Sequence, residues 1–154
     1  MTVTESTTGN GVLGQRLLRK EDPALLTGEA VYTNDMKVPG ALWLAVLRSP
    51  FAHARITSID VSGALAINGV HSAHTGADLA DSWASPMPCA WPVTDDMKNP
   101  AHYPLAVDKV TYVGDGVVAV LAESEAIAHD ALDAIDVEYE PLPAVLDLEE
   151  AMKD

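Results

Sequence analysis

The pattern of hydrophobic and polar positions along the chain predicts several short strands. Residues 41–47 are apolar at every position and follow the turn signal Pro39-Gly40, which predicts a strand covered on both faces. Residues 54–61 alternate fairly well between apolar and polar side chains, and residues 136–140 alternate strictly, with three acids on one face. Each alternation predicts a strand with one buried face.

Residues 124–135 carry the clearest helical signal. Ser124 is a good N-cap residue, and an apolar stripe follows at helical spacing: Ile127, Ala128, Ala131, Leu132 and Ile135. Shorter patterns predict strands at 29–35, 70–75, 109–113 and 116–122. They also predict single helical turns within 13–26, at 62–67, from Asp78 onward and at 147–153.

Residues 81–104 form the least regular stretch of the sequence. Five of the ten prolines lie here, together with six side chains that normally need covering: Trp83, Met87, Cys89, Trp91, Met97 and Tyr103. A long loop without regular structure is uncommon inside a compact domain. Two explanations stay open: the loop folds back on its own domain, or it lies against a partner outside this chain.

Length and charge narrow the classes of protein to which the chain can belong. Its 154 residues suit one domain with a real core. With 9 basic against 23 acidic residues, the formal charge is −14, which makes nucleic acid and anionic lipid poor partners. Residues 1–60 are balanced, and residues 61–154 carry the whole acidic excess. The balanced part is therefore the better candidate for a protein interface.

The sequence also carries an expectation about location. The longest apolar run, 41–47, is too short to span a bilayer, and the polar residues 1–11 have neither the basic nor the apolar region of a signal peptide. Cys89 is the single cysteine, which fits a reducing compartment. We therefore expect a soluble, cytoplasmic protein without membrane insertion.

Two motifs share letters with known binding sites but lack the context that those sites need. Gly9, Gly11 and Gly14 match the dinucleotide-binding spacing, yet only a short polar lead precedes them, where that motif needs a strand. His71 and His74 lie on a predicted strand, where an offset of three residues points them to opposite faces. Neither a nucleotide site nor a metal site is expected from them.

Nucleophilic catalysis is not expected either. Ser49, His53 and Asp60 contain the residue types of a hydrolase triad, but no nucleophile elbow surrounds Ser49. Cys89 could act as a nucleophile, although a covered thiol is the usual role of a lone cysteine. The acids of 123–150 lack the spacing of calcium ligands and predict a solvated surface. From its residues alone, the chain is an acidic α+β domain without a complete catalytic set.

Three groups of residues, taken in chain order, carry a family resemblance. They are Arg16 to Gly28 with Tyr32 and Asp35; Arg48-Ser49-Pro50-Phe51-Ala52-His53-Ala54 with Ile59-Asp60 and Gly69-Val70; and Tyr103-Pro104-Leu105-Ala106 with Tyr112-Val113-Gly114, Asp130-Ala131 and 137–143. Over about residues 11–152, the chain resembles the N-terminal α/β hammerhead domain of molybdenum hydroxylase large subunits. That family includes aerobic carbon monoxide dehydrogenase, xanthine dehydrogenase and aldehyde oxidoreductases.

The resemblance implies a fold and a domain organisation. The expected fold class is α+β, an α/β hammerhead with a mixed sheet and a few short helices. Residues 1–10 are expected to be a disordered lead. Residues 11–154 are expected to form the hammerhead domain, as a fragment of a much longer large subunit.

The resemblance also implies the function of a parent complex. Such a complex hydroxylates its substrate at a molybdenum–molybdopterin centre with oxygen from water, and electrons pass to 2Fe-2S and FAD groups in partner subunits or domains. The expected partners are the downstream molybdenum-binding part of the same chain and the iron–sulfur and flavin subunits. This chain is expected to be a structural or assembly domain, with no catalytic, cofactor-binding or metal-binding residue of its own. The alternative is a standalone protein- or ligand-binding module without enzymatic activity.

Five residues are the candidate interface. Arg48, Ser49 and His53 offer hydrogen-bond donors on a proline-restrained segment, and Trp83 and Trp91 offer apolar surface on the irregular loop. We expect both segments to dock onto the molybdenum-binding part or a neighbouring subunit. The ordinary alternative is that Arg48 and His53 only bind local carbonyl groups.

Overall fold

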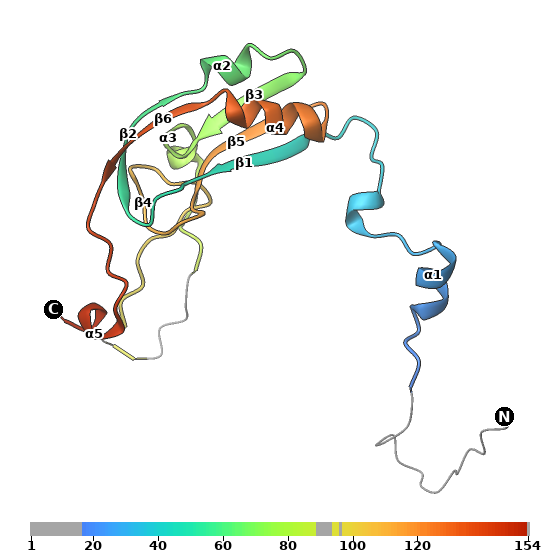
Figure 1. The fold of residues 1–154 in the computed structure, drawn as a ribbon, viewed down its shortest axis with the longest axis horizontal. Coiled ribbons are helices and arrows are strands. Elements are labelled where there is room, and N and C mark those ends of the chain that lie inside the picture. Colours follow the sequence, from blue (N-terminus) through green and yellow to red (C-terminus); the bar gives the residue numbers. More distant parts are fainter. Residues whose placement is uncertain (1–16, 89–93, 96, 154) are drawn as a thin grey trace, which may run out of the picture. The chain divides into compact units, whose positions relative to one another are not determined.

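The computed structural model describes residues 17–88, 94–95 and 97–153. The chain divides into two units, residues 1–39 and residues 40–154. The second unit contains every strand and the hydrophobic core (Figure 1). Among the helices of the described ranges, none has the length and hydropathy that crossing a bilayer requires.

The first unit contains a short helix, α1 (Asp22–Thr27). A proline lies in its first turn. The backbone N–H groups of a first turn have no partner within the helix, so the proline, which lacks this group, costs no hydrogen bond there. The helix ends at Gly28, whose φ of 75° lies in the left-handed region that glycine adopts without strain. The helical turn expected within residues 13–26 is confirmed at this place.

The strand predicted for residues 29–35 is wrong, because the chain turns there. The Tyr32 N–H donates to the Asp35 carboxylate at 3.0 Å and closes a 3-10 turn, η1 (Thr33–Asp35). A local side-chain acceptor of this kind competes with strand pairing. None of the described residues 17–39 is buried.

The second unit follows the predicted order of elements closely. They are β1 (Trp43–Arg48), β2 (Ala54–Asp60), α2 (Ser62–Leu65), β3 (Val70–Thr75), α3 (Gly76–Leu79), η2 (Ala80–Ser82), β4 (Lys109–Val110), β5 (Gly116–Ala122), α4 (Glu125–Asp133), β6 (Asp136–Pro141) and α5 (Leu148–Ala151). β4 is shorter than predicted, because the chain after Val110 enters a turn. α3 begins two residues before Asp78, because the Thr75 side chain caps it.

In the first sheet, β5 lies between β1 and β3, and both pairings are antiparallel. Val120 lies opposite Ala45 on one side and Ala73 on the other, so these three side chains share the inner face. Helix α4 packs against this sheet, over β1 and β5.

The second sheet has the order β4-β2-β6, again with antiparallel pairings. Ile56 pairs with Tyr139 on the inner face, and Arg55 pairs with Glu140 on the outer face. The α+β fold class is confirmed, with one difference in detail. A mixed sheet was expected, whereas the described strands form two antiparallel sheets, because β5 and β2 run opposite to both of their neighbours.

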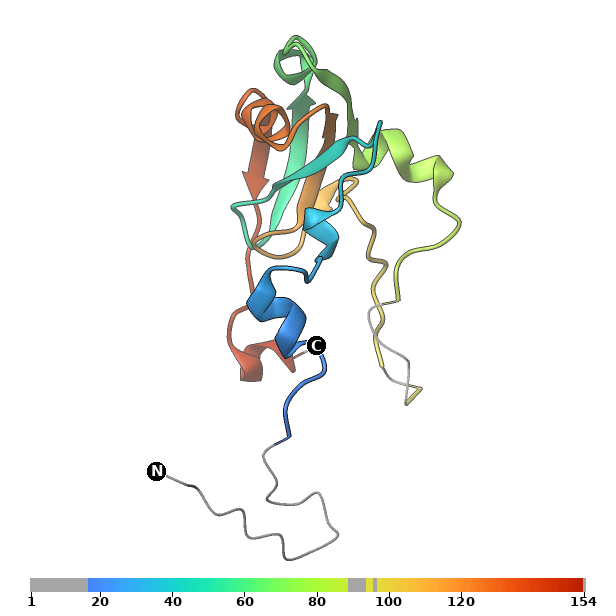
Figure 2. The ribbon, with the colours of Figure 1, turned by 90° about the vertical axis from the view of Figure 1, so that its right-hand side faces the viewer.

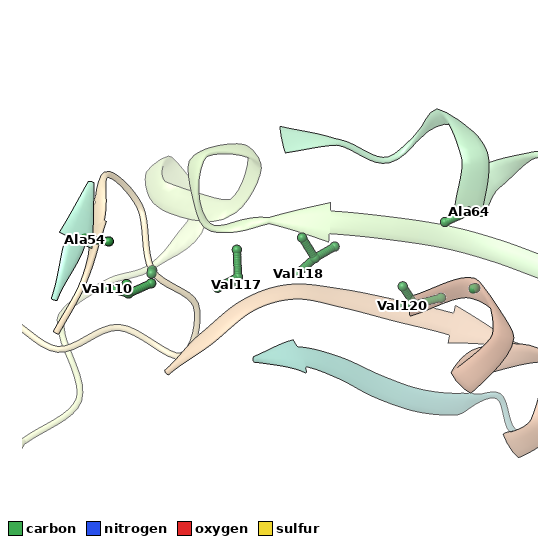
Figure 3. Packing of buried hydrophobic residues seen from close by; sticks show 8 residues of the cluster. Ala54, Ala64, Val110, Val117, Val118 and Val120 are labelled. Carbon is green, nitrogen blue, oxygen red and sulfur yellow. The ribbon is translucent and has the colours of Figure 1, made fainter. Parts of the chain in front are cut away.

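The core fills the space between the first sheet, the second sheet and α4 (Figures 2 and 3). Its buried members are small: Ala54, Ala64, Ala106, Val110, Val117, Val118, Val120 and Ala131. Larger side chains, among them Ile56, Leu132 and Tyr139, close its periphery. Because such interiors are close-packed, adding a single methyl group changes the stability of the fold.

Helix α4 forms as the sequence predicts. The Ser124 hydroxyl accepts a hydrogen bond from the Ile127 N–H at 3.3 Å and caps the first turn. Ala128 and Ala131 on the inner side are fully buried, which brings the helix close to β1 and β5. The C-terminal end leads directly into β6.

Candidate functional site

The predicted interface segment at the end of β1 is bound to the turn that precedes β5. Arg48 Nη1 donates to the Gly114 carbonyl oxygen at 2.9 Å. Next to it, the Ser49 N–H donates to the Asp115 oxygen, and the Gly114 N–H donates to the Ser49 oxygen, both at 2.8 Å. Three hydrogen bonds therefore join two segments that are 66 residues apart.

Asp115 holds that turn in shape. Its side chain is buried, and the carboxylate accepts from the Thr111 N–H at 3.0 Å and from the Thr111 hydroxyl at 3.3 Å. Gly114 has a φ of 93°, which favours glycine. Nothing in the Gly114-Asp115-Gly116 sequence indicated that the aspartate would be buried.

Ser49 is buried and its hydroxyl is fully engaged. Its Oγ accepts from the Phe51 N–H and donates to the Phe51 oxygen, each at 3.0 Å. Burial raises the pKa of the Tyr139 phenol, and a side-chain hydrogen bond with Ser49 offsets part of that rise. The ring of Phe51 packs on Tyr139 with 5.1 Å between centroids. Ser49 is a structural hydroxyl, which removes the support for a nucleophile at this position.

His53 joins the same segment to the end of β6. Its Nδ1 donates to the Pro143 oxygen at 2.7 Å, and its carbonyl oxygen accepts from the Leu142 N–H at 2.9 Å. Asp60 lies elsewhere, where its carboxylate accepts from the Ser62 N–H at 2.8 Å. Hydrogen bonds with Ser62, with its side chain first and with its N–H second, lower the pKa of Asp60. The three residue types of a hydrolase triad are therefore not brought together.

A groove lies beside these hydrogen-bonded segments. Its volume is about 530 Å³, and it is lined by Ala52, His53, Thr111, Tyr112, Val113, Pro143, Ala144, Val145 and Leu146. Three of the lining side chains are largely exposed: Val113 by 65%, Val145 by 60% and Leu146 by 88%. The residue pattern did not predict this groove, because its walls come from segments that the fold alone brings together.

The described part of the irregular loop pairs with itself. The Met87 N–H donates to the His102 oxygen at 2.7 Å, and the ring of Trp83 stacks on Tyr103 with centroids 5.1 Å apart. Trp83 is half-buried. Trp91 and Cys89 lie outside the described residues.

The returning end of the loop is anchored on the first sheet. The Ala106 N–H donates to the Gly116 oxygen at 2.7 Å, and Leu105 and Ala106 are buried. Gly76 lies so close that an added Cβ would collide with the Ala106 oxygen. The loop therefore leaves from a fixed base.

The remaining sequence candidates lie apart from this region. His71 Nε2 is 3.7 Å from Glu123, while His74 shares a hydrogen bond with Ser72 at 3.1 Å. Within the described ranges, no group of three or more His, Cys, Asp or Glu side chains could hold a metal ion. Gly9, Gly11 and Gly14 lie outside the described part of the chain.

A molybdenum cofactor, which the resemblance implies for a parent complex, does not fit the described residues of this chain. Among them no cluster of metal-ligating side chains exists, and the 530 Å³ groove is lined mostly by apolar groups. A charged cofactor would need cationic or hydrogen-bonding groups around it. No catalytic step is therefore assigned to residues of this chain.

Comparison with known proteins places the chain in a family. Residues 27–143 match the model of the a/b hammerhead domain of aldehyde oxidase and xanthine dehydrogenase. This chain belongs to that family, whose members form one domain in the large subunits of molybdenum hydroxylases.

Individual relatives agree with this assignment. The nicotine 6-hydroxylase large subunit of Paenarthrobacter nicotinovorans is 44% identical over 88% of this chain and 16% of its own length. Quinoline 2-oxidoreductase of Pseudomonas putida 86 superimposes with a TM-score of 0.81, at 44% identity, over 89% of this chain and 17% of its own. A Cu,Mo-CO dehydrogenase gives a TM-score of 0.78 at 35% identity, over 91% and 17%. The chain thus spans about a sixth of the length of these proteins.

Proposed function

We propose that this chain serves as a structural and assembly domain of a molybdenum hydroxylase large subunit. The observation that carries the proposal is the surface formed by residues 48–53, 111–116 and 141–143. Hydrogen bonds join these segments, and an exposed apolar groove lies beside them. Such a rigid surface loses little conformational freedom on docking, so more of the contact energy is retained in binding. The partner is the molybdenum-binding part of the same polypeptide or a neighbouring subunit.

Within this surface, the five candidate residues have two kinds of role. Arg48, Ser49 and His53 hold the surface in shape through bonds to the backbone of this chain. Trp83 presents apolar surface on the loop that leaves residues 76–82, and the proposal extends this role to Trp91, which lies outside the described residues. Aromatic side chains are enriched in the buried centres of protein interfaces.

The cofactors and location follow from the same proposal. The parent complex would use molybdenum–molybdopterin for hydroxylation, with 2Fe-2S and FAD groups in partner subunits or domains. It would work in the cytoplasm, in keeping with the single cysteine. The hammerhead domain would extend from residue 11 to residue 154.

A second candidate function is a standalone binding module. The groove of about 530 Å³ falls in the size range of small-molecule pockets. In that case the exposed Val113, Val145 and Leu146 would contact a ligand, and the chain would act without a molybdenum partner.

A chimeric large subunit tests the first proposal. The matching segment of the nicotine 6-hydroxylase large subunit would be replaced by this chain, and molybdenum, iron and flavin would be measured in the purified product. We expect all three to be retained. His53→Ala should reduce the yield of loaded complex, because it removes the bond to the Pro143 oxygen, whereas His71→Ala, on the exposed side of β3, should not.

The competing outcome is equally clear. A chimera that folds but binds no molybdenum, together with a stable isolated chain that takes up a small ligand in the groove, would favour the standalone module. Ligand uptake that Val113→Asp abolishes would locate that activity in the groove.

A further inference from the structure

The outer face of the first sheet has an unusual composition. Opposite residues of an antiparallel pair share a face, so the register places Leu44 of β1 beside Leu121 of β5 and Ser72 of β3. The next row joins Val46, Ala119 and His74. None of these six described positions carries Asp, Glu, Lys or Arg.

The two faces of this sheet differ in how well the chain covers them. On the inner face, Val118, Val120 and Ala122 are fully buried under the core and α4. On the outer face, Leu44 is 63% exposed, and Val46, Ala119 and Leu121 are only half-buried. The described residues of the second unit thus leave an apolar sheet face in contact with water.

The second sheet shows what a solvated face looks like in the same domain. Its outer positions on β2 and β6 are charged or polar, as in the pair of Arg55 with Glu140 and the pair of Asp60 with Asp136. Strands with one wet face alternate in this way, whereas strands covered on both faces are apolar throughout. β5 and the run 41–47 are apolar throughout, so their sequence is that of strands with two covered faces.

We infer that the outer face of the β1-β5-β3 sheet is covered by an apolar segment of the remaining large-subunit polypeptide. This inference rests on the proposed function and adds the docking face to it. The relatives carry about five-sixths of their length outside the matched segment, so a covering segment would be tethered to the face. Tethering gives it a high effective concentration, an advantage that a second copy of the chain does not have.

Charge distribution supports an apolar rather than a basic occupant. The chain has a formal charge of −14, yet the acids lie on other surfaces, such as the outer positions of β6. A basic partner would find no acidic side chain at the six positions of this face. An aliphatic or aromatic segment would instead remove the apolar surface of Leu44 and Leu121 from water.

Leu44→Asp tests the inference, with Leu65→Asp as the matched control. Both leucines are exposed in the domain, by 63% and 48%, so each isolated variant should melt within about 2 °C of the unsubstituted chain. In the chimeric large subunit, Leu44→Asp should lower the yield of molybdenum-loaded protein at least about tenfold, because it buries an unpaired charge. Leu65→Asp should leave that yield unchanged.

The outcomes separate this inference from the proposed function. If the unsubstituted chimera loads molybdenum and Leu44→Asp loads it equally well, the face is not a docking site, although the proposed function stands. If the unsubstituted chimera fails to load, both are overturned. If the isolated chain is a dimer by sedimentation and Leu44→Asp makes it a monomer, the occupant is a second copy and the inference is wrong.

Discussion

At the scale of single residues, the candidate site is held by buried or backbone-directed polar groups. Ser49 and Asp115 are the two buried polar side chains among the described residues, and both bind backbone groups of neighbouring turns. Buried polar groups stabilise a fold when they are paired and cost free energy when they lose their partners. Substitutions at these positions should therefore change the free energy of unfolding by a measurable amount.

Removing the Ser49 hydroxyl should weaken the fold. Ser49→Ala leaves the Phe51 N–H and oxygen without their side-chain partner, and we expect the free energy of unfolding to fall by about 1–2 kcal/mol. Urea titration followed by fluorescence would measure it. Ser58→Ala, at an exposed position of β2, should change stability by less than about 0.5 kcal/mol; equal effects of the two would contradict the structural role.

Adding a single methyl group at Gly76 should be costly. Its Cβ would meet the Ala106 oxygen, so either α3 or the anchored end of the loop must shift. We expect Gly76→Ala to lower the free energy of unfolding by about 3 kcal/mol. Ala77→Gly, at the exposed neighbouring position, should cost about 1 kcal/mol or less. A neutral Gly76→Ala would show that the loop is not anchored there.

At the scale of elements, a side-chain cap determines where α3 begins. Thr75 and Asp78 cap α3 reciprocally: the Asp78 carboxylate accepts from the Thr75 N–H at 2.9 Å, and the Thr75 hydroxyl accepts from the Asp78 N–H at 3.2 Å. The bond from the Thr75 N–H, followed by the bond that the Thr75 hydroxyl donates to the same carboxylate at 2.8 Å, holds the pKa of Asp78 below its ordinary value of 3.8. A four-residue helix such as α3 depends on such bonds, because it makes few of its own.

The cap of α3 should give stability a dependence on pH. Because the pKa of Asp78 is lower in the folded state, its contribution is complete above about pH 4 and disappears as the pH falls through the folded value. Asp78→Asn should therefore cost about 1 kcal/mol at pH 7 and clearly less once the pH is low enough to protonate the carboxylate in the folded state. Thermal unfolding at pH 7 and along a series of falling pH values measures this, with Asp130→Asn, at an exposed position of α4, as the control; a cost independent of pH would contradict it.

At the scale of the whole molecule, the sheets and α4 form one core, which lies within residues 40–154. The described residues of the arm, 17–39, contribute no buried side chain. Burial of apolar surface is the main source of stability. The arm therefore contributes little stability to the isolated chain, although it belongs to the predicted hammerhead domain of residues 11–154.

Removal of the arm tests this directly. A chain that starts at Gly40 should unfold cooperatively, with a melting temperature within about 3 °C of the full chain. Calorimetry would show it. A broad or absent transition would mean that the arm completes the core.

Most of the elements could be predicted from the amino-acid sequence, because their signals are local. Alternation at 54–61 and 136–140, the apolar stripe of α4 and the Ser124 cap each lie within one short window, and all are confirmed. The strand expected at 29–35 failed because the Asp35 carboxylate closed a turn that periodicity does not report. Family motifs then carried the fold class, which comparison confirms.

The roles of the candidate residues, in contrast, follow from contacts between segments that are distant in the sequence. Arg48 reaches the Gly114 oxygen across 66 residues, and His53 reaches the Pro143 oxygen across 90, separations that no local pattern encodes. The tertiary arrangement also determines how β1, which is apolar on both faces, is used. The sequence marks it as a strand with two covered faces, but the arrangement of sheets and helix decides which face this domain covers and which one it leaves exposed.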